Sequence, residues 1–485
     1  MPMASILVCL VIGWWVTTGG TGHPFKPYDQ VLATFYDVQG QSMLSGRLDV
    51  PCSVIRQEAY IVGDRCYGYF GVTPSLFRLP FNALFPAYRG HWAALSIIAG
   101  YALLLLSAYG LSLIIRRHVL QVSPVGGLFS WVTAIFLLAL GLGSTSVFLL
   151  SRPVVHQEAI MWSSALALCS LVFMLRHVFL GDGWALLIAT VLALLAIHAR
   201  PLAGLTAASF CAIGAAARVL LIERSDRKES VVARLSMLLR SPLAVSGIVA
   251  GGLVVASYSA MNYAKFGAIE GMPLRYYVSS SPQLEERLKG SLFHVANIRW
   301  NLSNQFGMEG LKATDHPPFV KVQFRMQGEI PRDREQLRYP EAHIGGIEPY
   351  ISIPVGMTGL LLFSVVGVVG ALRSSRRLIL VLLCLAALIG PIATLMFAYV
   401  SYRYLHEYAI FFALAGAIAV CHLGERSARS GRISAILLAI IVAGNVLLNI
   451  GFLIRYQTSE TNLGPPIQEM KDAVERLRGL RGYGP

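Results

Sequence analysis

Stretches of about twenty mainly apolar residues recur along the whole chain, and this recurrence limits the possible folds more than any other feature. A helix needs about 20 such residues to cross the hydrocarbon core of a bilayer. The composition agrees, because 55% of the 485 residues are hydrophobic and only 14% are charged. The sequence therefore predicts an all-α polytopic membrane protein.

We expect about eleven transmembrane helices, one for each apolar segment. The segments lie near residues 3–20, 92–115, 126–150, 158–180, 184–199, 202–222, 242–261, 350–372, 378–400, 408–423 and 433–455. Only Arg200 and Pro201 separate the fifth segment from the sixth, and a fusion of these two would invert everything downstream. The first segment has no basic flank and no small-residue cleavage site before Thr21, so we expect it to be retained.

The distribution of basic residues predicts the orientation, since short loops rich in Lys and Arg stay in the cytoplasm. The short loops of one face contain Arg152, Arg200 and Arg403. The other face collects many more: Arg116, Arg117, Arg176, Arg224, Arg227, Lys228, Arg234, Arg240, Arg373, Arg376, Arg377, Arg426, Arg429 and Arg432. This places the N-terminus inside and the C-terminal tail, residues 456–485, outside. It also accounts for most of the net charge of +14, so we expect no nucleic-acid partner.

Two outer segments are too long to be simple connections: residues 21–91 and residues 262–349. Loops of this length usually carry function. The first opens on an amphipathic pattern that predicts a helix on the membrane surface. Its apolar side consists of Tyr28, Val31, Leu32, Phe35 and Tyr36, and its polar side of Gln30, Thr34, Asp37 and Gln41. This helix would hold Asp37 at the water edge; an ordinary solvated face explains the same spacing.

Cys52 and Cys66 differ from the other five cysteines, which lie in or beside apolar segments. Both fall in the first outer segment, where an oxidising compartment would allow them to form a disulfide. A bridge closing about 15 residues restricts the unfolded loop by about 3 kcal/mol. Two free thiols are the alternative.

Further ionisable side chains lie where apolar segments begin or end. His156 and Glu158 enter the fourth span, and Arg200 and Arg403 lie in outer turns. Such groups are costly near lipid unless they face a polar cavity or a partner, so they are functional candidates. A glutamate also suits a helix N-terminus, and an arginine that only anchors its span would look the same.

Several motifs resemble the bacterial polytopic GT-C-type glycosyltransferases and their relatives. They occur in the same order and in similar topological places. The motifs are FYDVQ at 35–39, SGRLDVP at 45–51, EAY at 58–60, YGYFGVTPSLFRLP at 67–80, VHQEA at 155–159, NYAKFG at 262–267 and RY at 403–404. The resemblance covers most of the chain through loose motifs, and it supports the superfamily better than any single substrate.

The resemblance implies a GT-C-like fold with a catalytic acid in the first outer loop and a polyprenyl-phosphate-linked sugar as donor. Protein O-mannosyltransferases and aminoarabinose transferases are similar in layout. Asp37 then matches the first-loop acid. Glu158, with His156 beside it, matches the acid after the third span. Arg403 matches a basic residue near the lipid phosphate, and Arg200 is similarly placed. Relatives often have paired acids in this loop, whereas here Asp37 is flanked by Tyr36 and Val38. This difference puts a divalent metal site held by two carboxylates in doubt.

The chemistry of such a transfer fits these residue types. A carboxylate can deprotonate the acceptor hydroxyl, and positioned arginines can stabilise the leaving phosphate without a metal. The acceptor would be an envelope glycan, lipid or protein at the outer face of a bacterial cytoplasmic membrane, with membrane lipid around it. Glu270, Arg275, Tyr276 and Tyr277 are candidates to line the acceptor groove.

Two other classes of protein fit the same spans. A transporter or flippase of envelope lipid intermediates would place charges along a path through the membrane and show an internal repeat. A non-catalytic envelope assembly protein would keep the fold without activity. Convergence of Asp37, Glu158 and Arg403 on one outward site would favour the enzyme, and a polar path through the middle would favour the transporter.

Overall fold

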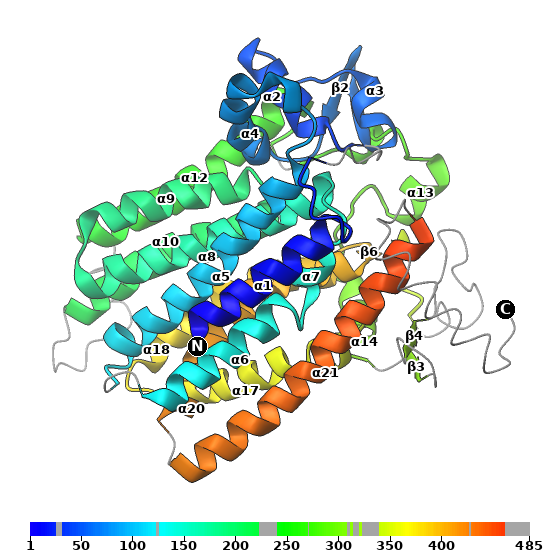
Figure 1. The fold of residues 1–485 in the computed structure, drawn as a ribbon. Helices are drawn as coiled ribbons and strands as arrows, with labels where there is room; N and C mark the ends of the chain where they lie inside the picture. The colour runs from blue at the N-terminus through cyan, green and yellow to red at the C-terminus, as the bar shows by residue number, and fades with distance from the viewer. Residues whose placement is uncertain are drawn as a thin grey trace, which may run out of the picture.

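The computed structural model is a bundle of membrane helices with a small module at one end (Figure 1). It describes residues 1–25, 32–122, 126–222, 240–269, 271–307, 311–313, 320–322, 339–425 and 428–460. Tyr28, Gln30, Val31 and Glu270 lie outside these ranges, as does most of the basic loop 224–240 and the tail after residue 460.

The bundle confirms the predicted all-α polytopic architecture. The described part has six helices long and apolar enough to span a membrane and five shorter apolar ones, and together they match the eleven predicted segments. They are α1 (Pro2–Thr17), α5 (Ala93–Ile114), α6 (Gly127–Gly141), α8 (Val155–Leu180), α9 (Gly183–Ile197), α10 (Pro201–Ile222), α12 (Pro242–Phe266), α17 (Thr358–Arg373), α18 (Arg377–Ala387) with α19 (Ile389–Met396), α20 (Ala409–Gly424) and α21 (Ala428–Glu460).

Some predicted spans are interrupted. The third is split into α6 and a short helix α7 (Thr145–Leu150), and the eighth begins with a separate turn, α16 (Ile353–Gly356). The ninth breaks between α18 and α19 at Leu388, three residues before Pro391. Proline has no N–H to donate, so it is tolerated in the first turn of a new helix but not in the middle of a continuous one. The π-helical turn η3 (Ile115–Val119) extends α5.

Segments 184–199 and 202–222 are two helices, α9 and α10, as predicted. The turn between them is tight: a Cβ on Gly204 would lie 2.1 Å from the Cα of Ile197. Only glycine permits this approach. The turn consists of His198, Ala199 and Arg200, and it contacts the module, because His198 O accepts from Thr73 N.

The first outer segment folds into that module. Its elements are α2 (Phe35–Leu44), α3 (Cys52–Ile55), η1 (Arg56–Glu58), β1 (Ala59–Val62), β2 (Arg65–Gly68), α4 (Thr73–Leu84) and η2 (Pro86–Tyr88). The strands β1 and β2 form an antiparallel hairpin, with Ala59 opposite Gly68. Cys52 and Cys66 form a disulfide between α3 and β2, with their Cα atoms 5.3 Å apart.

The predicted surface helix differs from the observed one. Helix α2 begins at Phe35, and Phe35 and Tyr36 are buried against Ile55, Phe70 and Val155 instead of facing lipid. The reason is that the module folds back over the start of α8, so the apolar side of α2 packs against protein. Large exposed apolar side chains occur instead on and just after α4, at Leu76, Phe81, Leu84 and Phe85.

Backbone contacts fix the module to the bundle. Thr73 N donates to His198 O at 3.0 Å, and a Cβ on Gly71 would lie 1.8 Å from the same oxygen, so this crossing requires glycine. The buried Lys265, at the end of α12, donates to Gly68 O at 3.2 Å and to Phe70 O at 3.3 Å. These contacts hold residues 68–73 against the helix ends that surround the candidate site.

The second outer segment is tied to both the module and the bundle. Its described elements are η4 (Leu274–Tyr276), α13 (Pro282–Arg287), α14 (Asn297–Phe306), β3 (Leu311–Ala313), β4 (Val320–Val322) and β5 (Gly346–Ile347). Tyr277 pairs with Tyr60 of β1, and β5 pairs in parallel with β6 (Tyr399–Val400). The two long outer segments therefore meet over the same end of the bundle.

Candidate active site at the outer end of the bundle

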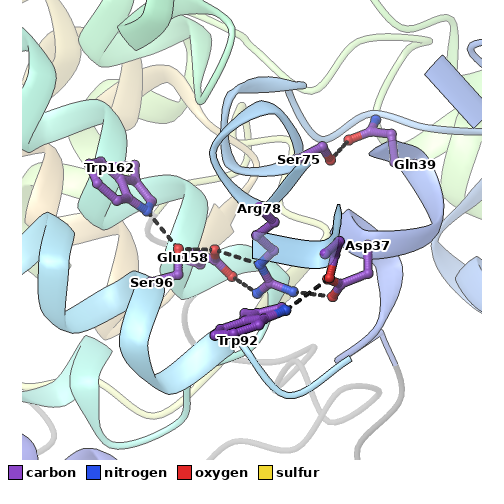
Figure 2. Close-up of polar contacts among 9 residues, drawn as sticks. Asp37, Gln39, Ser75, Arg78, Trp92, Ser96, Glu158 and Trp162 are labelled. Carbon is purple, nitrogen blue, oxygen red and sulfur yellow. Dashed lines mark hydrogen bonds and ion pairs between the residues drawn. The ribbon is translucent and has the colours of Figure 1, made fainter. Parts of the chain in front are cut away.

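Arg78 joins two of the predicted catalytic residues, Asp37 and Glu158 (Figure 2). Its Nη1 lies 2.5 Å from Asp37 Oδ2, its Nη2 lies 2.5 Å from Glu158 Oε2, and its Nε donates to Glu158 Oε1 at 3.3 Å. We call these three residues the carboxylate–arginine network. All three side chains are buried, with 2% of Arg78, 6% of Asp37 and none of Glu158 exposed.

Four neighbours complete the hydrogen bonding of this network. Asn82 Nδ2 donates to the second Asp37 oxygen at 2.8 Å, and Trp92 Nε1 donates to Asn82 Oδ1 at 2.8 Å. Ser96 Oγ donates to Glu158 Oε1 at 2.5 Å and accepts from Trp162 Nε1 at 2.9 Å. Figure 2 shows these residues converging from α2, α4, α5 and α8 on one point. Each carboxylate oxygen therefore accepts at least one hydrogen bond.

The local fold explains why Arg78 points inward. It lies in α4 between Phe77 and Leu79, and the apolar residues at Leu76, Phe81 and Leu84 occupy the exposed side. Residues three or four apart share a helix face, which places Arg78 and Asn82 together on the buried side. Burial alone lowers the pKa of Arg78, but Glu158 and Asp37 outweigh it and hold that pKa above its ordinary value. The guanidinium is therefore charged.

Arg200 and Arg403, the predicted phosphate ligands, flank one aromatic ring. Their guanidinium carbons lie 5.4 and 5.1 Å from the centre of the Tyr404 ring. We call Arg200, Arg403 and Tyr404 the outer basic site. Arg403 and Tyr404 belong to η5 (Tyr402–Tyr408), which precedes α20, and Arg200 comes from the α9–α10 turn.

Each arginine of the outer basic site also contacts one carboxylate. Arg200 Nε lies 2.5 Å from Glu407 Oε1, and Arg403 Nη2 lies 2.6 Å from Glu348 Oε1. The second Glu348 oxygen accepts from Ser401 Oγ at 2.7 Å. Arg403 Nε is buried, yet no residue in the described ranges accepts a hydrogen bond from it. A planar cation with a free donor can bind an anionic oxygen.

His156 faces a different set of residues from Glu158. The two lie two positions apart in the first turn of α8, so their side chains point to different sides of the helix. His156 Nε2 lies 3.8 Å from Glu58 Oε1, its ring packs edge-on against Phe70, and the charges of Arg200 and Arg403 act on it. His156 thus lies between the module and the outer basic site.

Tyr36 connects the two sides of α8. Its hydroxyl donates to Val155 O at 3.1 Å, next to His156, and Arg78 lies 5.5 Å from the centre of its ring. The charge of Arg200 also acts on Tyr36. The carboxylate–arginine network and the outer basic site are therefore neighbours at one end of the bundle.

The structure thus brings the predicted site residues to one region but not into one constellation. Asp37 pairs through Arg78 with Glu158, whereas His156, Arg200 and Arg403 gather around Glu58 and Tyr404. Asp37 is buried on the inner side of α2, not held at the water edge as the helical pattern suggested. In the described ranges no three His, Cys, Asp or Glu side chains group as metal ligands.

Sequence reasoning gave no role to Arg78, Glu58, Tyr404, Glu348 or Glu407. One signal was available for Arg78, since a single arginine interrupts an otherwise apolar helical stretch. Glu58 and Tyr404 lie inside motifs that carried the family resemblance, but their roles depend on tertiary contacts. Glu348 and Glu407 are recognisable only as partners of the two arginines.

An apolar groove of about 390 Å³ has none of these groups in its lining. It opens between α1 and α5 and is lined by Leu10, Val11, Trp14, Leu95, Ile98, Ala99 and Ala102. A groove with such a lining suits a hydrocarbon chain and offers no group for acid–base chemistry.

Comparison with known proteins leaves the family open. No family model matches the sequence, and no curated protein matches it. Among solved structures, the fold is similar to ArnT from Cupriavidus metallidurans bound to undecaprenyl phosphate, at 11% identity and a TM-score of 0.45. The similarity covers 93% of this chain and 75% of that one. At this level it assigns neither residues nor a ligand to this chain.

Proposed function

We propose that the protein is a membrane glycosyltransferase that moves a sugar from a polyprenyl-phosphate donor to an acceptor in the cell envelope. The reaction would take place on the outer face of a bacterial cytoplasmic membrane. One observation carries the proposal: Arg200 and Arg403 flank Tyr404, and each contacts a carboxylate, at the end of the membrane bundle where the described parts of both long outer segments meet.

The outer basic site supplies what the donor phosphate needs. The phosphate becomes more negative as its bond to the sugar breaks, and fixed guanidinium groups in a desolvated site stabilise that charge. Glu348 and Glu407 hold the arginines in place. The free Arg403 Nε leaves one buried donor for a phosphate oxygen.

The apolar faces of the bundle supply what the polyprenyl chain needs. The site lies where α8 and α10 begin and α9 ends, so a lipid embedded in the bilayer would reach it with its phosphate first. A soluble donor would gain nothing from eleven spans. This fits a lipid-linked sugar as donor substrate, with membrane lipid as the surrounding solvent.

The reaction also needs a group that takes a proton from the acceptor hydroxyl. Asp37 is the candidate from sequence, and its two oxygens already accept from Arg78 and Asn82. Both Asp37 oxygens are thus occupied by side-chain donors before any acceptor binds. The carboxylate–arginine network is therefore proposed to organise the site, with Asp37 retained as the candidate base from the sequence.

The outer basic site is tested by binding of undecaprenyl phosphate to the purified protein in lipid nanodiscs. We expect Arg403→Ala to weaken binding about 10- to 100-fold, since a hydrogen bond to a charged group contributes about 1.5–3 kcal/mol. Arg299→Ala is the matched control, because this arginine of α14 is 78% exposed and only distantly paired.

Three results would oppose the proposal. Equal binding by the wild type, Arg403→Ala and Arg299→Ala would remove the phosphate site. Movement of a polyprenyl-linked sugar across vesicles without transfer would support the flippase. Deletion of the protein without loss of any sugar from the envelope would favour the non-catalytic role.

A further inference from the structure

We infer that Glu58, together with His156, takes the proton from the acceptor hydroxyl, and that Asp37 is a positioning residue that acts through Arg78. The inference rests on the proposed function and specifies its reacting groups. It moves the proton acceptor from the interior of the module to the place where the module, α8 and η5 meet.

Glu58 is placed to meet an acceptor, unlike Asp37 and Glu158, the two acids predicted from the sequence. It ends η1, and its side chain is 20% exposed, against 6% for Asp37 and none for Glu158. Its Oε1 lies 3.8 Å from His156 Nε2, and its Oε2 accepts from the Tyr277 hydroxyl at 3.4 Å. Substrate can approach Glu58 without breaking an ion pair.

The bonding of the carboxylates points the same way. In the described ranges, both Asp37 oxygens and both Glu158 oxygens accept from Arg78 or from its neighbours. The described contacts of Glu58 are with a hydroxyl and an imidazole, which are weaker partners than a guanidinium. In the described ranges the Glu58 carboxylate therefore has no guanidinium hydrogen-bonded to it, unlike Asp37 and Glu158.

The surroundings of Glu58 tune it toward proton transfer. Burial raises its pKa above the ordinary value of 4.5, and the Arg403 charge partly offsets this rise. The other titratable groups that face it are His156 from α8, Glu348 after β5, Tyr277 after η4, and Tyr60 and Tyr69 from the hairpin. A raised pKa brings a carboxylate closer to the operating pH, where general bases are most efficient.

The step balances as a single displacement. The acceptor oxygen forms a bond to the anomeric carbon of the sugar while its proton passes to the Glu58 carboxylate. The bond from that carbon to the phosphate oxygen breaks, and its electron pair leaves with the polyprenyl phosphate. Arg403 and Arg200 stabilise the departing phosphate, and His156 hydrogen-bonds the carboxyl group that has formed.

The location also gives both outer segments a function. Glu58 comes from the first segment and Tyr277 from the second, and the backbone pairing of Tyr60 with Tyr277 holds them together. An acceptor between the two segments would reach Glu58 from the outside. The donor would reach the outer basic site from the membrane.

The test compares three variants of the full-length protein in nanodiscs. These are Glu58→Gln, Asp37→Asn and the control Asp64→Asn. Asp64 is an exposed carboxylate at the tip of the β1–β2 hairpin. Undecaprenyl-phosphate-linked hexoses, pentoses and amino sugars serve as donors, an envelope extract as acceptor, and released undecaprenyl phosphate is measured from pH 5 to 9. Binding of undecaprenyl phosphate is measured in parallel.

We expect Glu58→Gln to lower turnover by a factor of about 10² to 10⁴ with undecaprenyl phosphate binding nearly unchanged. The turnover of the wild type should fall at acidic pH, where the base becomes protonated, and this acidic limb of the pH profile should be absent in Glu58→Gln. Asp64→Asn should match the wild type. Asp37→Asn should lose thermal stability and some turnover but keep the acidic limb.

A second variant keeps the inference testable if Glu58→Gln does not fold. The Tyr277 hydroxyl lowers the pKa of Glu58, so Tyr277→Phe should move the acidic limb of the profile to higher pH. An unmoved limb would overturn the role of Glu58. Wild-type turnover in Glu58→Gln, or loss of the acidic limb in Asp37→Asn, would also overturn the role of Glu58. Neither result would contradict the proposed function. A wild-type protein that neither binds undecaprenyl phosphate nor transfers any of these sugars would remove both proposals.

Discussion

At the scale of residues, the main feature is one buried guanidinium shared by two carboxylates from distant parts of the chain. Arg78 is 41 positions from Asp37 and 80 from Glu158. Separations of this size explain why sequence reasoning singled out both acids but not their common partner. From the sequence each acid is an isolated charge near the membrane, where burial without a partner is unfavourable. The partner that compensates both charges, Arg78, is brought to them only by the fold.

We predict that Arg78→Met destabilises the protein by about 3–5 kcal/mol, because it leaves two buried carboxylates without a countercharge. The triple variant Arg78→Met, Asp37→Asn, Glu158→Gln should recover much of that loss, because no buried charge remains. Thermal unfolding in detergent measures both. Arg47→Ala is the control, since Arg47 is 55% exposed and its 3.6 Å pair with Asp49 should contribute about 0–1 kcal/mol. A triple variant no more stable than Arg78→Met would contradict this account.

At the scale of elements, the apolar pattern predicted the membrane helices well but not the outer module. A span must be apolar along about 20 residues whatever it packs against, so its signal is local. The apolar side of α2 is ambiguous, because Phe35 and Tyr36 would satisfy lipid as well as protein. Its partners Ile55, Phe70 and Val155 lie elsewhere in the chain, and only the fold selects them.

The disulfide provides a test of the module as a unit. We predict that Cys52→Ser with Cys66→Ser lowers the stability of the module by about 3 kcal/mol while the helices still insert. Hydrogen exchange of residues 50–70 should rise, and exchange in α8 and α20 should not. Alkylation of the wild type in denaturant without reductant should label neither cysteine. Labelling of both would contradict the bridge.

At the scale of the whole molecule, the candidate site is a property of one end of the bundle. Residues from α2, α4, η1, α8, the α9–α10 turn and η5 meet there, and the second outer segment joins them through Tyr277 and Glu348. The basic loops predicted to be cytoplasmic belong to the opposite helix ends. Their charge asymmetry predicted which end is outside, and the identity of the reacting groups required the assembled structure.

The orientation can be tested with reporters fused at two positions. We predict that a reporter after Tyr456 is active only outside the cytoplasm and one within residues 224–240 only inside. The reason is the excess of arginine in the short loops of the second face. Two reporters active on the same side would contradict this assignment and reverse the side on which the candidate site works.

The pairing of Tyr60 with Tyr277, and of β5 with β6, joins early and late parts of the chain at one site. This has a consequence for biosynthesis. The module emerges early in translation, whereas Arg403 and Tyr404 belong to the last fifth of the chain. A nascent protein therefore inserts most of its helices before the outer basic site is complete. Under the proposed function, a prematurely terminated chain would insert into the bilayer but would lack Arg403, so incomplete molecules would not transfer sugar.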